Sequence, residues 1–78
     1  MDNLQKYNTV FMETLEVGED KLNCLKYHEV ETWDSVGHMT LIAALEECFQ
    51  IMMDTDDIID LSSYERGKDI LRKYAVDL

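Results

Sequence analysis

The segment DSVGHMTLIAALEECF, residues 34–49, has the pattern of an amphipathic helix. Ser35 is a suitable N-cap residue for such a helix, and Asp34 could share that role. Apolar-leaning positions recur every three or four residues, which predicts a helix over 35–52 with one face in the core. The positions on that face are His38, Leu41, Ile42, Leu45, Phe49 and Met52.

A second group of apolar residues lies on a different side of the same predicted helix, near its start. These residues are Val36, Met39 and Ala43. A monomeric domain has no obvious need for apolar side chains there. They are either ordinary exposed positions or a patch for contact with a partner protein.

The residues before this segment predict a first helix and a long connection. The helix is expected over 2–16 and is ended by Gly18; its buried face consists of Leu4, Tyr7, Val10, Phe11 and Leu15. The connection over 17–34 is long for a small domain, and such connections are usually functional. Its apolar residues would anchor it to the core, and these are Leu22, Leu25, Tyr27, Val30 and Trp33.

The residues after the segment predict two further helices. Residues 54–57 break the helical pattern and cap a short turn over 57–61, whose packing groups are Ile58, Ile59 and Leu61. A last helix is expected over 63–75, capped by Ser62 or Ser63, with Ile70, Leu71 and Tyr74 facing inward. The sequence therefore predicts one all-α domain over 1–78, with three main helices, one short helix and a long first loop.

Charge is distributed unevenly along the chain, whose formal net charge is −10. No Lys or Arg occurs between Tyr27 and Tyr64. Such a surface repels nucleic acid and anionic membranes and attracts basic proteins, although acidity also simply keeps a small domain soluble. The acidic residues of this stretch are Glu29, Glu31, Asp34, Glu46, Glu47, Asp54, Asp56, Asp57 and Asp60.

Composition also indicates a cellular compartment. The sequence has no run of about 18 apolar residues, so no membrane span is predicted. Its first residues lack the basic and apolar regions of a signal peptide, and we expect a cytoplasmic monomer. Cys24 and Cys48, the only cysteines, are expected to be free thiols rather than a disulfide.

The acidic residues do not fit a calcium-binding EF-hand. In a loop that starts at Asp54, Asp56 and Glu65 fall at the third and twelfth positions. Ile58 then occupies a ligand position, and Ile59 stands where the turn requires glycine. We expect no metal site.

Ser35 and His38 could share a helix face, with Asp34 beside them, as in a hydrolytic site. A nucleophile also requires an oriented base, an oxyanion hole and a substrate pocket, which 78 residues without a glycine-rich elbow hardly provide. We therefore expect no catalysis by this chain, and a packed, hydrogen-bonded His38.

The same segment resembles the modification motif and second helix of acyl carrier proteins. That family has an Asp-Ser-Leu-type tripeptide followed at fixed distance by Ala-Leu-Glu-Glu-x-Phe. The matching elements here are Asp34-Ser35-Val36 and Ala44-Leu45-Glu46-Glu47-Cys48-Phe49. The tripeptide is a weak motif, but its spacing from the second element is specific. The resemblance covers the whole chain in helix order and approximate lengths, and it implies the family's four-helix bundle.

The resemblance implies that Ser35 is joined through a phosphodiester to 4′-phosphopantetheine, which a phosphopantetheinyl transferase takes from coenzyme A. The thiol of this arm, rather than Cys24 or Cys48, would carry acyl groups as thioesters. The start of a helix favours a phosphate group. Enzymes that load and accept the acyl group would dock through basic surfaces, and the residues expected to meet them are Asp34, Val36, Met39, Ala43, Glu46, Glu47, Asp56 and Asp57.

The chain departs from the fatty-acid synthesis members of the family at the start of the second helix. Those members usually have acidic residues at the positions of Gly37 and Thr40, and Leu at the position of Val36. The version found here is similar to stand-alone carriers of specialised biosynthetic pathways and to some peptidyl carriers. The cargo is therefore open between acyl and aminoacyl groups. The alternative function is an acidic helical interaction module without a covalent arm.

Overall fold

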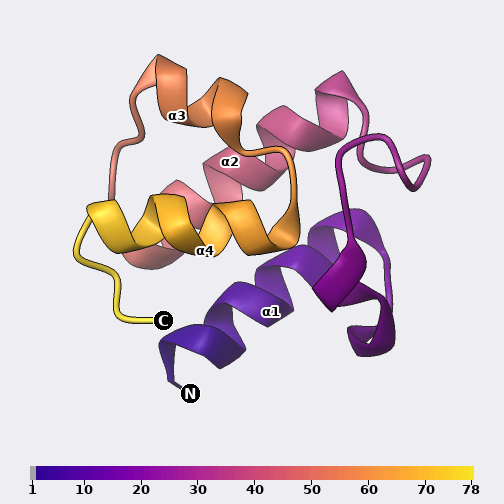
Figure 1. Cartoon of the computed structure of the whole chain (residues 1–78), viewed down its shortest axis with the longest axis horizontal. Helices are drawn as coiled ribbons and strands as arrows, with labels where there is room; N and C mark the ends of the chain where they lie inside the picture. Colours follow the sequence, from indigo (N-terminus) through magenta and orange to yellow (C-terminus); the bar gives the residue numbers. More distant parts are fainter. Residues whose placement is uncertain (1) are drawn as a thin grey trace.

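The computed structural model describes residues 2–78, which form four α-helices and one 3₁₀-helix (Figure 1). The elements are α1 (Asn3–Leu15), η1 (Glu19–Cys24), α2 (Ser35–Phe49), α3 (Thr55–Asp60) and α4 (Tyr64–Lys73). Within residues 2–78 there is no β-strand, and one isolated bridge pairs Lys26 with Ser63. The prediction of an all-α chain is confirmed.

Both ends of α1 are closed by local hydrogen bonds. At its start, the Asp2 carboxylate accepts the Gln5 N–H at 2.8 Å, and the Gln5 side chain accepts the Asp2 N–H at 3.3 Å. At its end, Glu16 adopts the left-handed conformation, with φ of 55°, and its N–H bonds to the Met12 carbonyl. Gly18 lies beyond this stop and is the N-cap of η1, so the prediction that Gly18 ends α1 is wrong.

An aromatic cluster joins α1 to α4 and to the long connection. The Phe11 ring lies edge-on to both Trp33 and Tyr64, with ring centroids 5.6 and 5.4 Å apart. The buried Tyr7 hydroxyl donates to the Tyr64 carbonyl at 2.6 Å, and burial raises the pKa of Tyr7. The core-facing positions predicted for α1 are confirmed except Leu4, which is exposed at the helix start.

The connection between α1 and α2 is ordered by its own 3₁₀-helix and by the α3–α4 link. Leu22, Leu25 and Trp33 are buried as predicted. The Tyr27 N–H donates to the Ser62 carbonyl at 2.9 Å, and the Tyr64 N–H to the Leu25 carbonyl at 3.0 Å. These bonds hold the middle of the connection beside the start of α4 and leave the Tyr27 ring at the surface.

α2 is shorter than predicted, because the chain turns away after Phe49. Gln50 is in the left-handed conformation, with φ of 54°, and the Glu46 carboxylate accepts the Met53 N–H at 2.9 Å. This turn places Met53 in the core and leaves Met52 84% exposed. The prediction that Met52 faces the interior is therefore wrong.

Hydrogen bonds to the Asp57 side chain connect α3 to the end of α4. The Asp57 carboxylate is only 7% exposed and accepts hydrogen bonds from Lys73 Nζ at 2.5 Å and from the Tyr74 hydroxyl at 2.6 Å. The Tyr74 hydroxyl in turn accepts the Asp54 N–H at 2.8 Å. The hydrogen bonds from Lys73 and then Tyr74 hold the pKa of Asp57 below its usual range.

The end helices otherwise follow their sequence pattern. Ser63 caps α4 by accepting the Arg66 N–H at 3.0 Å, and Ile70 and Leu71 are buried as predicted. α3 begins two residues before the predicted turn. Ile59, predicted as a packing group, is instead exposed, whereas Asp57 on the same short helix is buried and Ile58 is half-buried.

Candidate functional site

Ser35 is the first residue of α2 and lies on the surface. Asp34, rather than Ser35, is the N-cap: its Oδ1 accepts the Gly37 N–H at 2.8 Å. No side-chain hydrogen bond within residues 2–78 involves the Ser35 hydroxyl, and the residue is exposed. The hydroxyl is therefore accessible from solvent, at the positive end of a helix dipole.

The first turn of α2 is held against the preceding connection by a close backbone approach. A Cβ atom on Gly37 would stand 1.8 Å from the Thr32 carbonyl oxygen, so only glycine fits there. The Thr32 hydroxyl donates to the Leu15 carbonyl at 2.5 Å, at the end of α1. The segment that leads into Ser35 is thus tied to both α1 and α2.

Apolar side chains are exposed in the first half of α2 and on α3. Val36 and Met39, predicted to form a patch, are 74% and 54% exposed, and Ala43 is exposed further along α2. Ile59 on α3, 74% exposed, is a further member that sequence reasoning placed in the core. The Ile58 carbonyl lies 2.7 Å from His38 Nε2, which brings this end of α3 against the first turns of α2.

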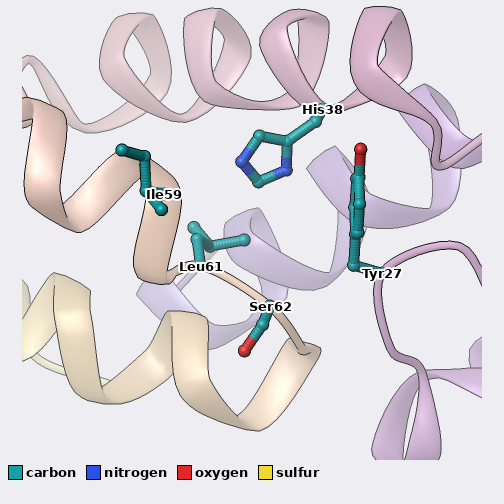
Figure 2. Close-up of a pocket in the computed structure, with 5 residues that line it drawn as sticks. All are labelled: Tyr27, His38, Ile59, Leu61 and Ser62. Carbon is teal, nitrogen blue, oxygen red and sulfur yellow. The ribbon is translucent and has the colours of Figure 1, made fainter.

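A small pocket lies between these elements. Its volume is about 250 Å³, and its lining residues come from the connection, α2, α3 and the α3–α4 link: Tyr27, His38, Ile59, Leu61 and Ser62. Figure 2 shows the His38 ring pointing from α2 into this hollow, with Tyr27 to one side and Ile59 and Leu61 on the other. The pocket is smaller than the roughly 300–1,000 Å³ of typical small-molecule sites.

His38 is half-buried and hydrogen-bonded, as the sequence predicts, and both of its ring nitrogens have partners. Trp33 Nε1 donates to His38 Nδ1 at 3.0 Å, and His38 Nε2 lies 2.7 Å from the Ile58 carbonyl oxygen. Both nitrogens are therefore engaged by groups other than Ser35, although Ser35 and His38 are neighbours on α2.

The acidic residues predicted to meet partners differ in exposure. Glu47 and Asp56 are exposed, whereas Glu46 is half-buried and uses its carboxylate to turn the chain after α2. The prediction that Asp57 lies on the docking surface is wrong, because Asp57 is buried and its carboxylate is bound by Lys73 and Tyr74. No local sequence pattern reveals this, because Lys73 lies on a different helix.

The remaining chemical groups are placed as follows. Cys24 is exposed and Cys48 is half-buried, and both are free thiols. Across residues 2–78, no cluster of three or more His, Cys, Asp or Glu side chains is arranged to hold a metal ion. No helix in this part of the chain has the length and apolar character needed to cross a membrane.

Comparison of the chain with known protein families, with curated proteins and with solved structures finds no match.

Proposed function

We propose that this chain is a carrier protein of the acyl carrier type, with 4′-phosphopantetheine attached to Ser35. The arm would hold acyl groups as thioesters and deliver them to partner enzymes in a specialised, cytoplasmic biosynthetic pathway. The observation that carries the proposal is the exposed Ser35 hydroxyl, free of side-chain hydrogen bonds, at the first position of α2. It directly follows the capping Asp34, in the segment that resembles the family's motif.

The start of α2 suits a phosphodiester. The first turn of a helix has N–H groups without helical partners and a positive dipole end, both of which favour a bound phosphate. His38 is engaged by Trp33 and Ile58, so Ser35 has no base of its own. The transferase would accordingly supply Mg²⁺ and a base, and this chain would be its substrate rather than an enzyme.

The surroundings of Ser35 suit docking of basic proteins. Val36, Met39 and Ala43 present apolar surface, and exposed Glu47 and Asp56 add negative charge around it. Because the stretch between Tyr27 and Tyr64 has no Lys or Arg, basic partners would be steered toward this side of the chain. Ile59, which is exposed, would belong to the docking residues, whereas Asp57, which is buried, would not.

The order of helices also supports the proposal. A long first connection, a second helix that starts at the modified serine, a short third helix and a final helix are the arrangement that the resemblance implies (Figure 1). We therefore include the acyl-carrier four-helix bundle in the proposal. A peptidyl carrier, loaded with an aminoacyl group, would use the same arm and the same serine.

The proposal is tested by incubating the purified chain with coenzyme A, Mg²⁺ and a promiscuous phosphopantetheinyl transferase, and then measuring the intact mass. The wild type should gain one phosphopantetheine and Ser35→Ala none. Ser62→Ala, which removes another exposed serine hydroxyl, should be modified like the wild type. An unmodified wild type, or a mass gain in Ser35→Ala, would contradict the proposal.

A second candidate function is an interaction module without a covalent arm. It is favoured by the exposure of Val36, Met39 and Ile59, which would form a contact surface whether or not Ser35 is modified. In that case Ser35→Ala would bind its partner like the wild type, whereas Met39→Ser would bind less tightly.

A further inference from the structure

The hydrogen bonds of His38 fix its protonation state. The indole N–H of Trp33 is only a donor, so His38 Nδ1, 3.0 Å away, must accept and must lack a proton. The Ile58 carbonyl is only an acceptor, so His38 Nε2, 2.7 Å away, must carry the proton. This pair of bonds, which we name the histidine bridge, therefore requires a neutral imidazole with its proton on Nε2.

We propose that the histidine bridge is a proton-sensitive switch that releases Trp33 from α2 when His38 becomes charged. A second proton, taken from solvent, would bind to Nδ1. Nδ1 would then be a donor and could no longer accept the hydrogen bond from the Trp33 N–H. The hydrogen bond from Nε2 to the Ile58 carbonyl is kept, because Nε2 is the donor in both protonation states. Protonation thus breaks the bond to the connection and keeps the bond to α3.

Loss of this bond is energetically unfavourable because Trp33 is fully buried in the core. A buried N–H group without an acceptor is unfavourable, and Trp33 would have to move or admit water. Trp33 immediately precedes the N-cap Asp34 and stands two residues before Ser35. Protonation of His38 would therefore loosen the segment that leads into Ser35.

The titratable groups around the bridge come from the connection, from α2 and from α3. The Tyr27 ring lies 5.4 Å from the His38 ring, and the His28 ring stacks on Tyr27 at 4.1 Å. On α3, Asp57 is bound to Lys73 and Tyr74, and Asp60 is bound to Arg66. On α2 itself, the Asp34 carboxylate is engaged by the Gly37 N–H. His28 is thus the group that a control must separate from His38.

The inference goes beyond the carrier proposal and does not depend on it, because the bridge belongs to the unmodified chain. The first measurement is the ¹⁵N NMR spectrum of the His38 ring in the wild type at pH 8, which reports the tautomer directly. A proton on Nε2 is expected; a proton on Nδ1 would overturn the proposal. This measurement requires no variant.

The second measurement is hydrogen exchange of the Trp33 indole N–H, corrected for the intrinsic effect of pH. Trp33 is the only tryptophan, so its signal is unambiguous. Exchange should accelerate about tenfold, as the loss of one hydrogen bond allows, over the pH range in which the ¹⁵N spectrum shows a second proton binding to His38. His38→Asn keeps an acceptor near Nδ1 that does not titrate, and it should lose this response.

His28→Gln is the matched control and should respond like the wild type. Persistence of the acceleration in His38→Asn, or its absence from the wild type, would show that the bridge does not sense protons. Modification of Ser35 at pH 8 is not expected to change in His28→Gln, so failure of the switch and failure of the carrier proposal remain distinguishable.

Discussion

The carbonyl oxygen of Thr32 lies 1.8 Å from the point where a Cβ atom would stand on Gly37, closer than any side chain allows. In an exposed helix, replacing glycine by alanine stabilises the fold by about 0.5–1 kcal/mol. Here Gly37→Ala must push the connection away from α2, and overpacking of this kind costs about 1–3 kcal/mol. We therefore expect Gly37→Ala to lower the free energy of unfolding, measured by urea denaturation.

Thr40→Ala is the control for this prediction, because Thr40 is exposed one turn further along α2. It should change stability little. A Gly37→Ala variant as stable as the wild type would show that the connection does not press against α2, and the position of the segment before Ser35 would need revision.

Replacing Asp57 by Asn should alter the dependence of stability on acid. Hydrogen bonds from Lys73 and Tyr74 hold the pKa of Asp57 in the folded state below its ordinary value of 3.8. The stabilisation is therefore present above about pH 4 and is lost as pH falls through the lowered pKa. Asp57→Asn should unfold more easily at pH 7 and lose less stability than the wild type between pH 5 and pH 2.

Asp56→Asn provides the matched comparison, since Asp56 is the exposed neighbour on the same helix. Thermal unfolding at several pH values would follow all three proteins. An acid profile of Asp57→Asn that parallels the wild type would mean that the Asp57–Lys73–Tyr74 contacts contribute nothing to folding.

Removing the Tyr7 hydroxyl should destabilise the aromatic cluster. Tyr7 is fully buried, and its hydroxyl donates to the Tyr64 carbonyl at 2.6 Å. Tyr7→Phe loses this bond and leaves a carbonyl without that donor, at a cost of about 1–2 kcal/mol in urea denaturation. Tyr27→Phe, at the surface, should lower the free energy of unfolding much less. Equal decreases in the two variants would show that the Tyr7–Tyr64 hydrogen bond does not contribute specifically to stability.

Charge reversal at Glu47 should slow the modification of Ser35. Glu47 is exposed on α2, and a basic transferase would be attracted to it. We expect Glu47→Lys to reduce kcat/KM for the transferase by about threefold to tenfold at low salt, with a smaller effect at high salt because ions screen the interaction. Glu13→Lys makes the same charge change on α1 and should have little effect. Equal effects at both positions would indicate attraction by net charge alone.

Most of the helices could be predicted from the sequence because their apolar residues repeat at helical spacing. This rule found the buried faces of α1 and α4 and the exposed Val36 and Met39. The ends of helices were less predictable, since backbone bonds decide them. α1 ends at Glu16, which adopts the left-handed conformation, and not at Gly18 as the sequence predicts. The turn after Phe49 places Met53 in the core, where the sequence predicts Met52.

The candidate site could be predicted in part, for a related reason. The start of α2 at Ser35 depends on local residues and could be predicted, although the N-cap is Asp34 and not Ser35. The burial of Asp57 depends on Lys73, sixteen residues away, and the requirement for glycine at position 37 depends on the Thr32 carbonyl in the connection. Neither contact leaves a periodic pattern in the sequence. The exposure of Ile59 was missed because a helix as short as α3 has too few residues to show which face is apolar.

The central claim, that Ser35 carries a thioester-bearing arm, is tested most directly by the mass of the protein isolated from its native host. We predict a mass above that of the sequence by phosphopantetheine or its acyl thioester, located at Ser35 by peptide mapping. Hydroxylamine, which cleaves thioesters, should release the acyl part and leave the arm. A native protein whose mass equals that of the sequence, with Ser35 unmodified, would contradict the account.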